Sequence, residues 1–242
     1  MQSSWQSVFE DLRSRWRPAG LDLAQPFRIG WYNQAVADAY RLPDFGRPTA
    51  LGILVGNTRA LWPRFLDALQ QNGSLLDGHD PLDRYVESLV LPALEPLAHR
   101  SEVRFAHDRP PRRVAMQRLA RVSGLAHLSP SHLSVHATYG PWIALRAAVV
   151  IDIKGPSGPP LEPPNPCPDC EQHCLPRFRE AIAAAGTTPA GHAAIERHWR
   201  LWLAVRDACP AGCSHRYGDA QIRYHYTKDR EVLRRASEGA GA

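Results

Sequence analysis

The sequence predicts an α+β protein: a mixed sheet flanked by helices, with a C-terminal helical extension that bears cysteines. Three observations support this fold class. Apolar runs of strand length alternate with segments of helical periodicity up to about residue 155. A proline-rich stretch then ends both patterns, and only helical segments follow it. All five cysteines lie in this second section, between residues 167 and 213.

The composition limits the classes of function. A chain of 242 residues with 44% hydrophobic residues can bury a substantial core. We expect a cytoplasmic protein with no membrane partner, because no secretion signal opens the sequence and no segment approaches the roughly 20 apolar residues that span a bilayer. The net charge is +5, but the basic residues are scattered, so we expect no nucleic-acid partner.

The first elements follow in order along the chain. Apolar residues recur every four positions over residues 7–16, which predicts an amphipathic helix. The apolar run over 49–56 predicts a buried strand, and a helix over 57–70 follows it. Asp80 precedes a further helical stretch, residues 81–94, and can cap it.

A strand over 102–107 and a helix over 112–126 lead to a long apolar run, "HATYGPWIALRAAVVIDI", residues 136–153. This run predicts a buried strand, yet it contains Arg146. An arginine in such a strand either faces solvent or pairs with a carboxylate, as exposed and paired arginines commonly do. Alternatively, its guanidinium faces a cavity and binds an anionic ligand.

The composition changes after this strand. We therefore divide the chain into a core, residues 1–155, and a second part, residues 156–242, made of a proline-rich connector and a cysteine-containing helical cap. Helices are predicted in the second part over 175–186, 189–209 and 217–226.

Four of the cysteines have spacings typical of a metal site: Cys167 and Cys170 are separated by two residues, Cys174 follows after three more, and Cys209 precedes a proline. This order is similar to a ferredoxin run with its third spacing one residue too long, which would hold an iron–sulfur cluster. The same spacings suit a four-cysteine zinc site. Free thiols or a redox-active pair are the third interpretation. An odd cysteine count argues against a disulfide framework.

Several collinear stretches, together about two thirds of the chain, carry a family resemblance. The main ones are "FRIGWYNQAVADAYRLP", "TALGILVGNTRALWPRFLDAL", "DPLDRYV", "HATYGPWIALR", "HWRLWLAVRDA" and "RYGDAQIRYHYTKDR". They resemble the cobalamin-processing proteins of the methylmalonic aciduria and homocystinuria type C family (MMACHC or CblC). The resemblance implies a nitroreductase-like fold, on which homodimers are common, so a homodimer is an expected assembly.

The resemblance further implies an enzyme that removes the upper axial ligand of cobalamin and passes the cofactor on. An alkyl ligand would leave by attack of a thiolate such as that of glutathione, and cyanide would leave after electron transfer from FMN or a flavoprotein reductant. In the family three arginines bind the carboxylates of glutathione, and the matching positions here are Arg146, Arg206 and Arg230. Positive charge near the thiol would also lower its pKa.

The flat corrin ring requires an apolar, aromatic pocket. The resemblance gives as candidate contacts Trp31, Tyr32, Asn33, His136, Tyr139, Gly140 and Trp142. Core packing is the alternative role of the aromatic ones. Two positions depart from the family, because Pro141 stands where many members have glycine and Arg121 stands where members have a histidine near the corrin. A polar helix face that includes His225 either lines the cavity or faces solvent.

Other functions remain open beside this one. The cysteines suit an iron–sulfur-dependent cobalamin oxidoreductase resembling epoxyqueuosine reductase. A cobalamin chaperone without catalysis would need the binding pocket alone. A flavin nitroreductase is compatible with the fold, although the sequence has no evident flavin-phosphate motif.

Overall fold

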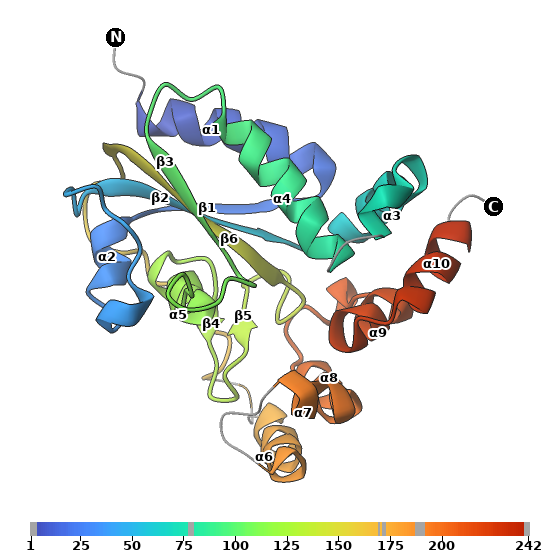
Figure 1. Ribbon diagram of the computed structural model, residues 1–242. Coiled ribbons are helices and arrows are strands. Elements are labelled where there is room, and N and C mark those ends of the chain that lie inside the picture. The colour runs from blue at the N-terminus through green and yellow to red at the C-terminus, as the bar shows by residue number, and fades with distance from the viewer. Residues whose placement is uncertain (1–3, 77–79, 169, 171–172, 187–191, 240–242) are drawn as a thin grey trace.

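The computed structural model describes residues 4–76, 80–168, 170, 173–186 and 192–239. Its centre is a four-stranded sheet in the order β1-β2-β6-β3, in which the three pairings are antiparallel (Figure 1). The strands are β1 (Leu23–Arg28), β2 (Ala50–Asn57), β3 (Ser101–Phe105) and β6 (Ala144–Lys154). A separate two-stranded sheet pairs β4 (His127–Leu128) with β5 (Ser134–Val135).

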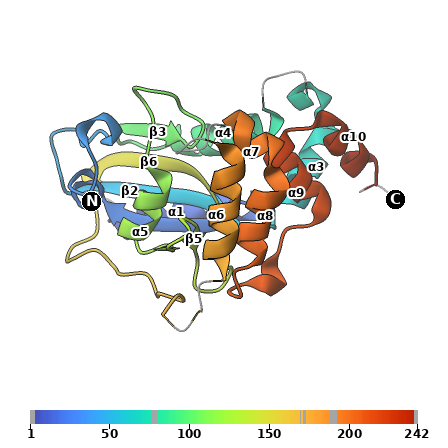
Figure 2. The same cartoon turned by 90° about the horizontal axis from the view of Figure 1, so that it is seen from below.

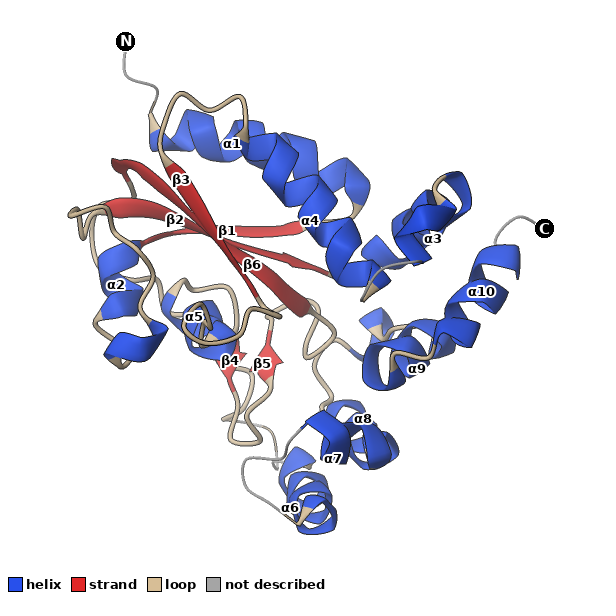
Figure 3. Cartoon of the chain, in the orientation of Figure 1, coloured by secondary structure: helices blue, strands red, loops and turns tan. Residues whose placement is uncertain are grey.

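Helices cover both faces of the four-stranded sheet, with α1 and α4 over one face and α2 and α5 over the other (Figure 3). The helices are α1 (Trp5–Trp16), α2 (Ile29–Asn33), α3 (Leu61–Gln71), α4 (Pro81–Leu94), α5 (Met116–Val122), α6 (Cys174–Ala185), α7 (His192–Arg197), α8 (Trp199–Asp207), α9 (Asp219–Thr227) and α10 (Arg230–Gly239). This arrangement confirms the predicted α+β class.

Strand β2 is buried along its whole length because both faces of the sheet are covered. Leu51, Ile53 and Val55 point into the core that α1, α3 and α4 complete. The alternate residues Ala50 and Leu54 point into the core shared with α2 and α5. The uninterrupted apolar run of this strand therefore reflects its position inside two helical layers.

Helices α6 to α10 lie together beyond one end of the sheet (Figure 2). The pair α6 and α8 share a small core that includes Cys174, Ala181 and Val205. Helices α9 and α10 instead contribute Tyr224 and Leu233 to the core of α1, α3 and α4. The last helices of the chain thus pack directly on the first section, and the division at residue 155 stays a prediction.

Two predicted elements begin later than expected. The long strand expected from residue 136 begins at Ala144, because the residues before it form a tight turn in which His136 and Gly140 exchange backbone hydrogen bonds. The helix expected from residue 57 begins at Leu61. The residues before it form a turn, in which the Asp22 carboxylate accepts hydrogen bonds from the backbone N–H and the hydroxyl of Thr58, and Thr58 Oγ1 accepts the N–H of Ala60 at 3.2 Å.

Other boundaries also differ from the sequence prediction. The helix expected over 112–126 is limited to α5, and Gly124 follows it with a left-handed φ of +81°. The helix expected over 189–209 is divided, over its described residues, into α7 and α8 at His198, whose backbone is not helical; residues 189–191 lie outside the described part of the chain. Strand β1 and helix α10 were not predicted. None of the helices, in the part of the chain that the structure describes, combines the length and the apolar character needed to cross a membrane.

Candidate functional site

A cavity of about 1170 Å³ lies between the end of the sheet and the C-terminal helices. Its wall is formed by the start of α4, the loop after β3, the residues that lead into β6, and parts of α8, α9 and α10. Pockets for drug-sized ligands measure roughly 300–1,000 Å³. The cavity is therefore large enough for a ligand bigger than an ordinary metabolite.

Arg146, Arg206 and Arg230 come from three different elements, and all three line this one cavity. Arg146 is 9% exposed and Arg206 is 6% exposed, which is unusual for arginine and requires partners for both charges. The Nε of Arg146 donates a hydrogen bond to Asn57 Oδ1 at 2.7 Å, and Nη1 lies 3.9 Å from the carboxylate of Asp83. Arg146 is thus held from two sides with its guanidinium at the cavity.

The guanidinium of Arg206 lies over the rings of Trp142 and Tyr217, 4.6 and 5.1 Å from their centroids. Its Nη2 donates to the carbonyl oxygen of Pro141, three residues before the start of β6. Arg230, the first residue of α10, is exposed, and its Nη1 donates to the carbonyl oxygen of Leu76 at 3.0 Å. The cavity is therefore lined by two buried arginines and one exposed arginine.

The cavity wall next to Arg146 is acidic, because Asp80, Asp83 and Glu87 fall at helical spacing at the start of α4. His107 lies against two of these carboxylates, with Nε2 2.8 Å from Glu87 and Nδ1 3.5 Å from Asp83. The hydrogen bond with Asp83, opposed by burial and helped by Glu87, raises the pKa of His107 to about 9. Lys228 pairs with Asp80 at 2.6 Å. The acidic side chains are therefore already matched by cations.

His225 also lines the cavity. Burial lowers its pKa well below the ordinary value for histidine, and the charges of Arg206, Arg146 and Lys228 act in the same direction, while Asp83 opposes them. The structure shows no hydrogen bond from its ring to another described residue. His225 is thus a neutral imidazole that can accept a proton or a hydrogen bond from a ligand.

Comparisons with known proteins agree with each other. A sequence model of the methylmalonic aciduria and homocystinuria type C family matches residues 20–234. This chain belongs to that family. The cyanocobalamin reductase / alkylcobalamin dealkylase of Mus musculus is 28% identical over 239 residues, which cover 89% of this chain and 77% of the mouse protein. The Homo sapiens protein of the same name is 28% identical over 238 residues, covering 89% and 76% of the two chains.

Solved structures support the fold. The crystal structure of a C. elegans B12-trafficking protein CblC, described as a human MMACHC homologue, superposes with a TM-score of 0.72 at 20% identity and covers 95% of both chains. An epoxyqueuosine reductase bound to a tRNA stem loop gives a TM-score of 0.50 at 11% identity, covering 94% of this chain and 70% of the reductase. At these identities the likeness concerns the fold alone.

Tyr32 and Asn33, from the first motif of the family resemblance, make hydrogen bonds that stabilise the fold. Tyr32 is fully buried, and its hydroxyl donates to the carbonyl oxygen of Tyr40 and accepts from the backbone N–H of Ala115. The Asn33 side chain exchanges two hydrogen bonds with the backbone of Leu42, both at 2.9 Å. These residues fix the loop after α2. Trp31 is half-buried beside Arg28 and stays a predicted corrin contact, as do its two neighbours.

The second motif forms the turn before β6. The Nδ1 of His136 accepts the backbone N–H of Thr138, and the ring of Tyr139 lies against the rings of both His136 and His215. Gly140 has a left-handed φ, and Trp142 is buried beneath Arg206. The structure places none of the seven predicted corrin contacts, all of them described residues, in the wall of the large cavity. Their contact with the corrin stays a prediction.

The four cysteines predicted as metal ligands line a second, small pocket together. Cys174 is buried, Cys167, Cys170 and Cys209 are half-buried, and all are free thiols. In the described ranges, however, no three His, Cys, Asp or Glu side chains lie close enough together to hold a metal ion as they stand. The structure brings the predicted residues to one place without forming a complete ligand cage.

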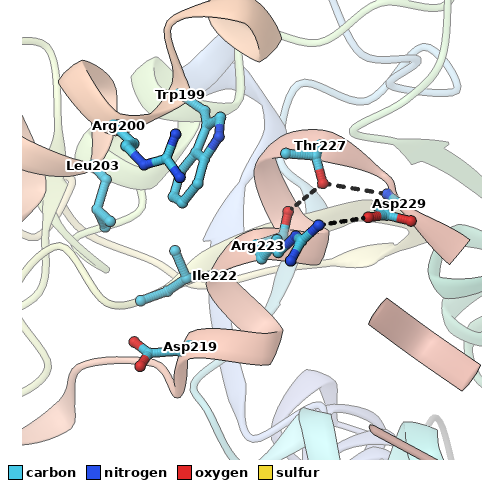
Figure 4. A pocket seen from close by; sticks show the side chains of 8 residues that line it. All are labelled: Trp199, Arg200, Leu203, Asp219, Ile222, Arg223, Thr227 and Asp229. Carbon is cyan, nitrogen blue, oxygen red and sulfur yellow. Dashed lines mark hydrogen bonds and ion pairs between the residues drawn. The ribbon is translucent and has the colours of Figure 1, made fainter. Parts of the chain in front are cut away.

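A third hollow, of about 470 Å³, lies between α8 and α9 (Figure 4). Its charged side chains already have partners: Arg223 pairs with Asp229 at 3.1 Å, and Arg200 lies 4.7 Å from the centroid of the Trp199 ring. It shares no lining residue with the large cavity. We therefore place the candidate site in the large cavity.

The sequence reasoning missed Asp83 and His107 as site residues. A signal for the first existed, because carboxylates at positions 80, 83 and 87 of a predicted helix fall on one face. His107 follows the end of β3 and gave no signal, since its partners lie on a different element. Local periodicity can indicate which residues share a helix face, but it cannot show what that face meets.

Proposed function

We propose that this chain removes the upper axial ligand of cobalamin, by glutathione-dependent dealkylation and by reductive decyanation, and then passes the cofactor on. One observation carries the proposal: arginines from β6, α8 and α10 meet at a single large cavity in a member of the MMACHC family. The curated relatives named cyanocobalamin reductase / alkylcobalamin dealkylase support it.

The arginines suit a thiol that carries carboxylates. Guanidinium groups bind carboxylates through paired, charge-assisted hydrogen bonds. Glutathione has two carboxylates and one thiol, so Arg146, Arg206 and Arg230 can fix its ends while their charge favours the thiolate. Holding the thiol near the cobalt-bound carbon supplies the orientation that a free thiol lacks.

His225 gives this reaction a place for the proton. The thiol transfers its proton to the neutral imidazole, and the sulfur lone pair forms the new sulfur–carbon bond. The carbon–cobalt bond breaks, and both of its electrons remain on cobalt as cob(I)alamin. Binding of two carboxylates would offset the charges of Arg146 and Arg206, which now lower the pKa of His225, and would make the imidazole a stronger base.

For cyanocobalamin we propose that the electron comes from a flavoprotein reductant, or from FMN held on this chain. The part of the protein is then to hold the corrinoid so that its lower base is displaced and cyanide can depart. Trp31, Tyr32, Asn33, His136, Tyr139, Gly140 and Trp142 are the proposed corrin contacts. Trp31, His136 and Tyr139 are half-buried, so they retain surface for a ligand.

We further propose a cytoplasmic protein that forms a homodimer. Five free thiols favour a reducing compartment. The homodimer rests on the family resemblance alone. A cobalamin chaperone without catalysis is the second candidate function, and it differs by one property: it would bind methylcobalamin and leave it intact when glutathione is added.

The test compares two exposed arginines, Arg230→Ala and Arg223→Ala. Arg230 lines the large cavity, whereas Arg223 lies in the hollow between α8 and α9. We expect Arg230→Ala to raise the KM for glutathione in methylcobalamin dealkylation about tenfold or more, since a hydrogen bond to a charged group contributes roughly 1.5–3 kcal/mol. Arg223→Ala should match the unmodified protein. Equal KM values in both variants would show that Arg230 does not bind the thiol substrate.

A further inference from the structure

Cys167, Cys170, Cys174 and Cys209 line one small, enclosed pocket, although 42 positions separate the first from the last in the sequence. The rest of its wall comes from the segment between β4 and β5 and from Pro210 and Ala211. Its free volume is about 20 Å³. A site of roughly 10–15 Å³ already holds one water molecule, so this pocket has room for a single small atom or ion.

The backbone around the cysteines is shaped to present them. Cys167 and Cys170 form a tight turn, in which the N–H of Cys170 donates to the carbonyl oxygen of Cys167 at 3.2 Å. The side chain of Asn165 accepts the N–H of Cys167 at 2.9 Å and steadies the entry to that turn. Cys174 is the first residue of α6. The two cysteines of this turn and the one at the start of the next helix therefore line the same pocket.

Cys209 approaches from another element. It follows α8, and its N–H donates to the carbonyl oxygen of Arg206 at 3.1 Å. Helix α8 packs against α6 through Val205 and Ala181, which brings Cys209 to the pocket opposite Cys174. The connector and the two helices therefore meet at the pocket that these four cysteines line.

The electrostatics of the pocket favour a cation. Four thiols share the pocket, and thiolates in so small a space repel one another unless a cation lies between them. No lysine or arginine is among the described residues of the pocket wall. A metal ion supplies the positive charge that allows all four thiols to lose their protons.

We propose that Cys167, Cys170, Cys174 and Cys209 form a four-thiolate site for one zinc ion. Zinc prefers four ligands in a tetrahedron, commonly with a Cys-x2–4-Cys spacing, and a structural site leaves no ligand position open. The thiols are not yet at ligating distance as they stand. Binding would therefore require Cys167 and Cys170, which lie outside helices and strands, to approach Cys174 and Cys209 more closely.

The room in the pocket favours one ion over an iron–sulfur cluster, which adds inorganic sulfides and several irons to the same four ligands. The zinc would join the proline-rich connector to the ends of α6 and α8. The backbone N–H of Cys209 donates a hydrogen bond to the carbonyl oxygen of Arg206. The zinc site would therefore also hold the end of α8 that carries this cavity arginine. Only this last consequence depends on the proposed function.

The test measures metal in the purified full chain, without cobalamin, so its outcome is independent of the dealkylase assay. Zinc, iron and acid-labile sulfide are determined for the unmodified protein, for Cys174→Ser and for Cys213→Ser. Cys213 is exposed and lies outside the pocket, which makes it the matched control. We expect one zinc per chain in the unmodified protein and in Cys213→Ser, and a loss of at least tenfold in Cys174→Ser.

Because Cys174→Ser is a change in a buried position, a second measurement uses the intact chain. Replacement of zinc by Co²⁺ should give the intense near-ultraviolet charge-transfer bands and the visible bands of a tetrahedral four-thiolate site. A thiol reagent should modify only Cys213 before the metal is removed and all five cysteines afterwards. Immediate reaction of all five thiols with no bound metal would overturn the site. Iron with stoichiometric labile sulfide would overturn the assignment to a single ion.

Discussion

Arg146 keeps a permanent charge within the apolar strand β6 because each side of its guanidinium has a partner. Asn57 accepts a hydrogen bond at 2.7 Å, and Asp83 supplies a carboxylate at 3.9 Å. Burial alone would raise the pKa of Asp83, but the hydrogen bond from His107 and the charges of Lys228, His107 and Arg146 keep it below the ordinary value. One ionised carboxylate thus holds two of the cations of the cavity wall.

The ion pair between His107 and Asp83 predicts how the stability of the fold varies with pH. The pKa of His107 is raised to about 9 in the folded chain, against 6.5 unperturbed, so its stabilisation is complete below pH 6.5 and is lost as pH rises through 9. The side chain is 32% exposed, and solvent screening therefore limits the effect to about 1 kcal/mol. We expect His107→Gln to lower the free energy of unfolding by this amount at pH 6.5 and by almost nothing at pH 10.

Urea denaturation at the two pH values measures this difference. His99→Gln is the control, because His99 lies in a separate hollow near the N-terminal helix. If the cost of His107→Gln is the same at pH 6.5 and pH 10, the ion pair does not contribute as described.

At the scale of elements, the turn before β6 is joined to the loop after α8. Gly140 has a φ of +55°, and a Cβ placed on it would lie 1.8 Å from the carbonyl oxygen of Ala211. Gly212 approaches the same turn with equal closeness, since its Cβ would lie 2.2 Å from the carbonyl carbon of Tyr139. The glycines therefore allow two backbones to meet, which fixes α8 relative to the strand that carries Arg146.

This contact predicts a large effect of a single methyl group. We expect Gly140→Ala to lower the free energy of unfolding by about 3 kcal/mol, because both the left-handed backbone and the clash oppose alanine. Gly186→Ala is the matched control: Gly186 has a similar φ of +69° but open space around it, so only the backbone term of about 1 kcal/mol applies. If both variants lowered the free energy of unfolding by the same amount, the close approach of the two backbones would not contribute to the effect of Gly140→Ala.

Elements with a complete local signal were predicted well from the sequence. Helix α4 has Asp80 as a cap that accepts the N–H of Leu82, and both of its ends lie where expected. The strand expected from residue 136 was wrong at its start, because Trp142 is buried against α8 and α9 and Ile143 against the core of α2 and α5, neither of them by strand pairing. Tertiary contacts of this kind leave no periodicity in the chain.

Site residues that belong to a recognisable sequence motif could be predicted, whereas their partners from distant segments could not. The arginines could be named from the family resemblance, and the structure does bring them to one cavity. Their partners Asn57 and Asp83 could not be named, because each contact joins elements distant in the sequence. The cysteine spacings indicated a shared site, and only the packing of α6 on α8 shows how Cys209 reaches it.

At the scale of the whole molecule, the chain is built so that its last helices close a cavity on its first section. The sheet supplies Arg146, while α8 and α10 supply Arg206 and Arg230 from beyond the connector. The proposed zinc site lies where the connector meets the start of α6 and the end of α8. The large cavity therefore takes its lining residues from both sections of the chain.

The most direct test is an anaerobic visible spectrum of the full chain with methylcobalamin, recorded before and after glutathione is added. We predict a shift to the base-off spectrum on binding, and the bands of cob(I)alamin or its oxidised product cob(II)alamin only once glutathione is present. A base-off shift with no later change would indicate a chaperone. No shift at all would contradict the central claim that this chain binds and processes cobalamin.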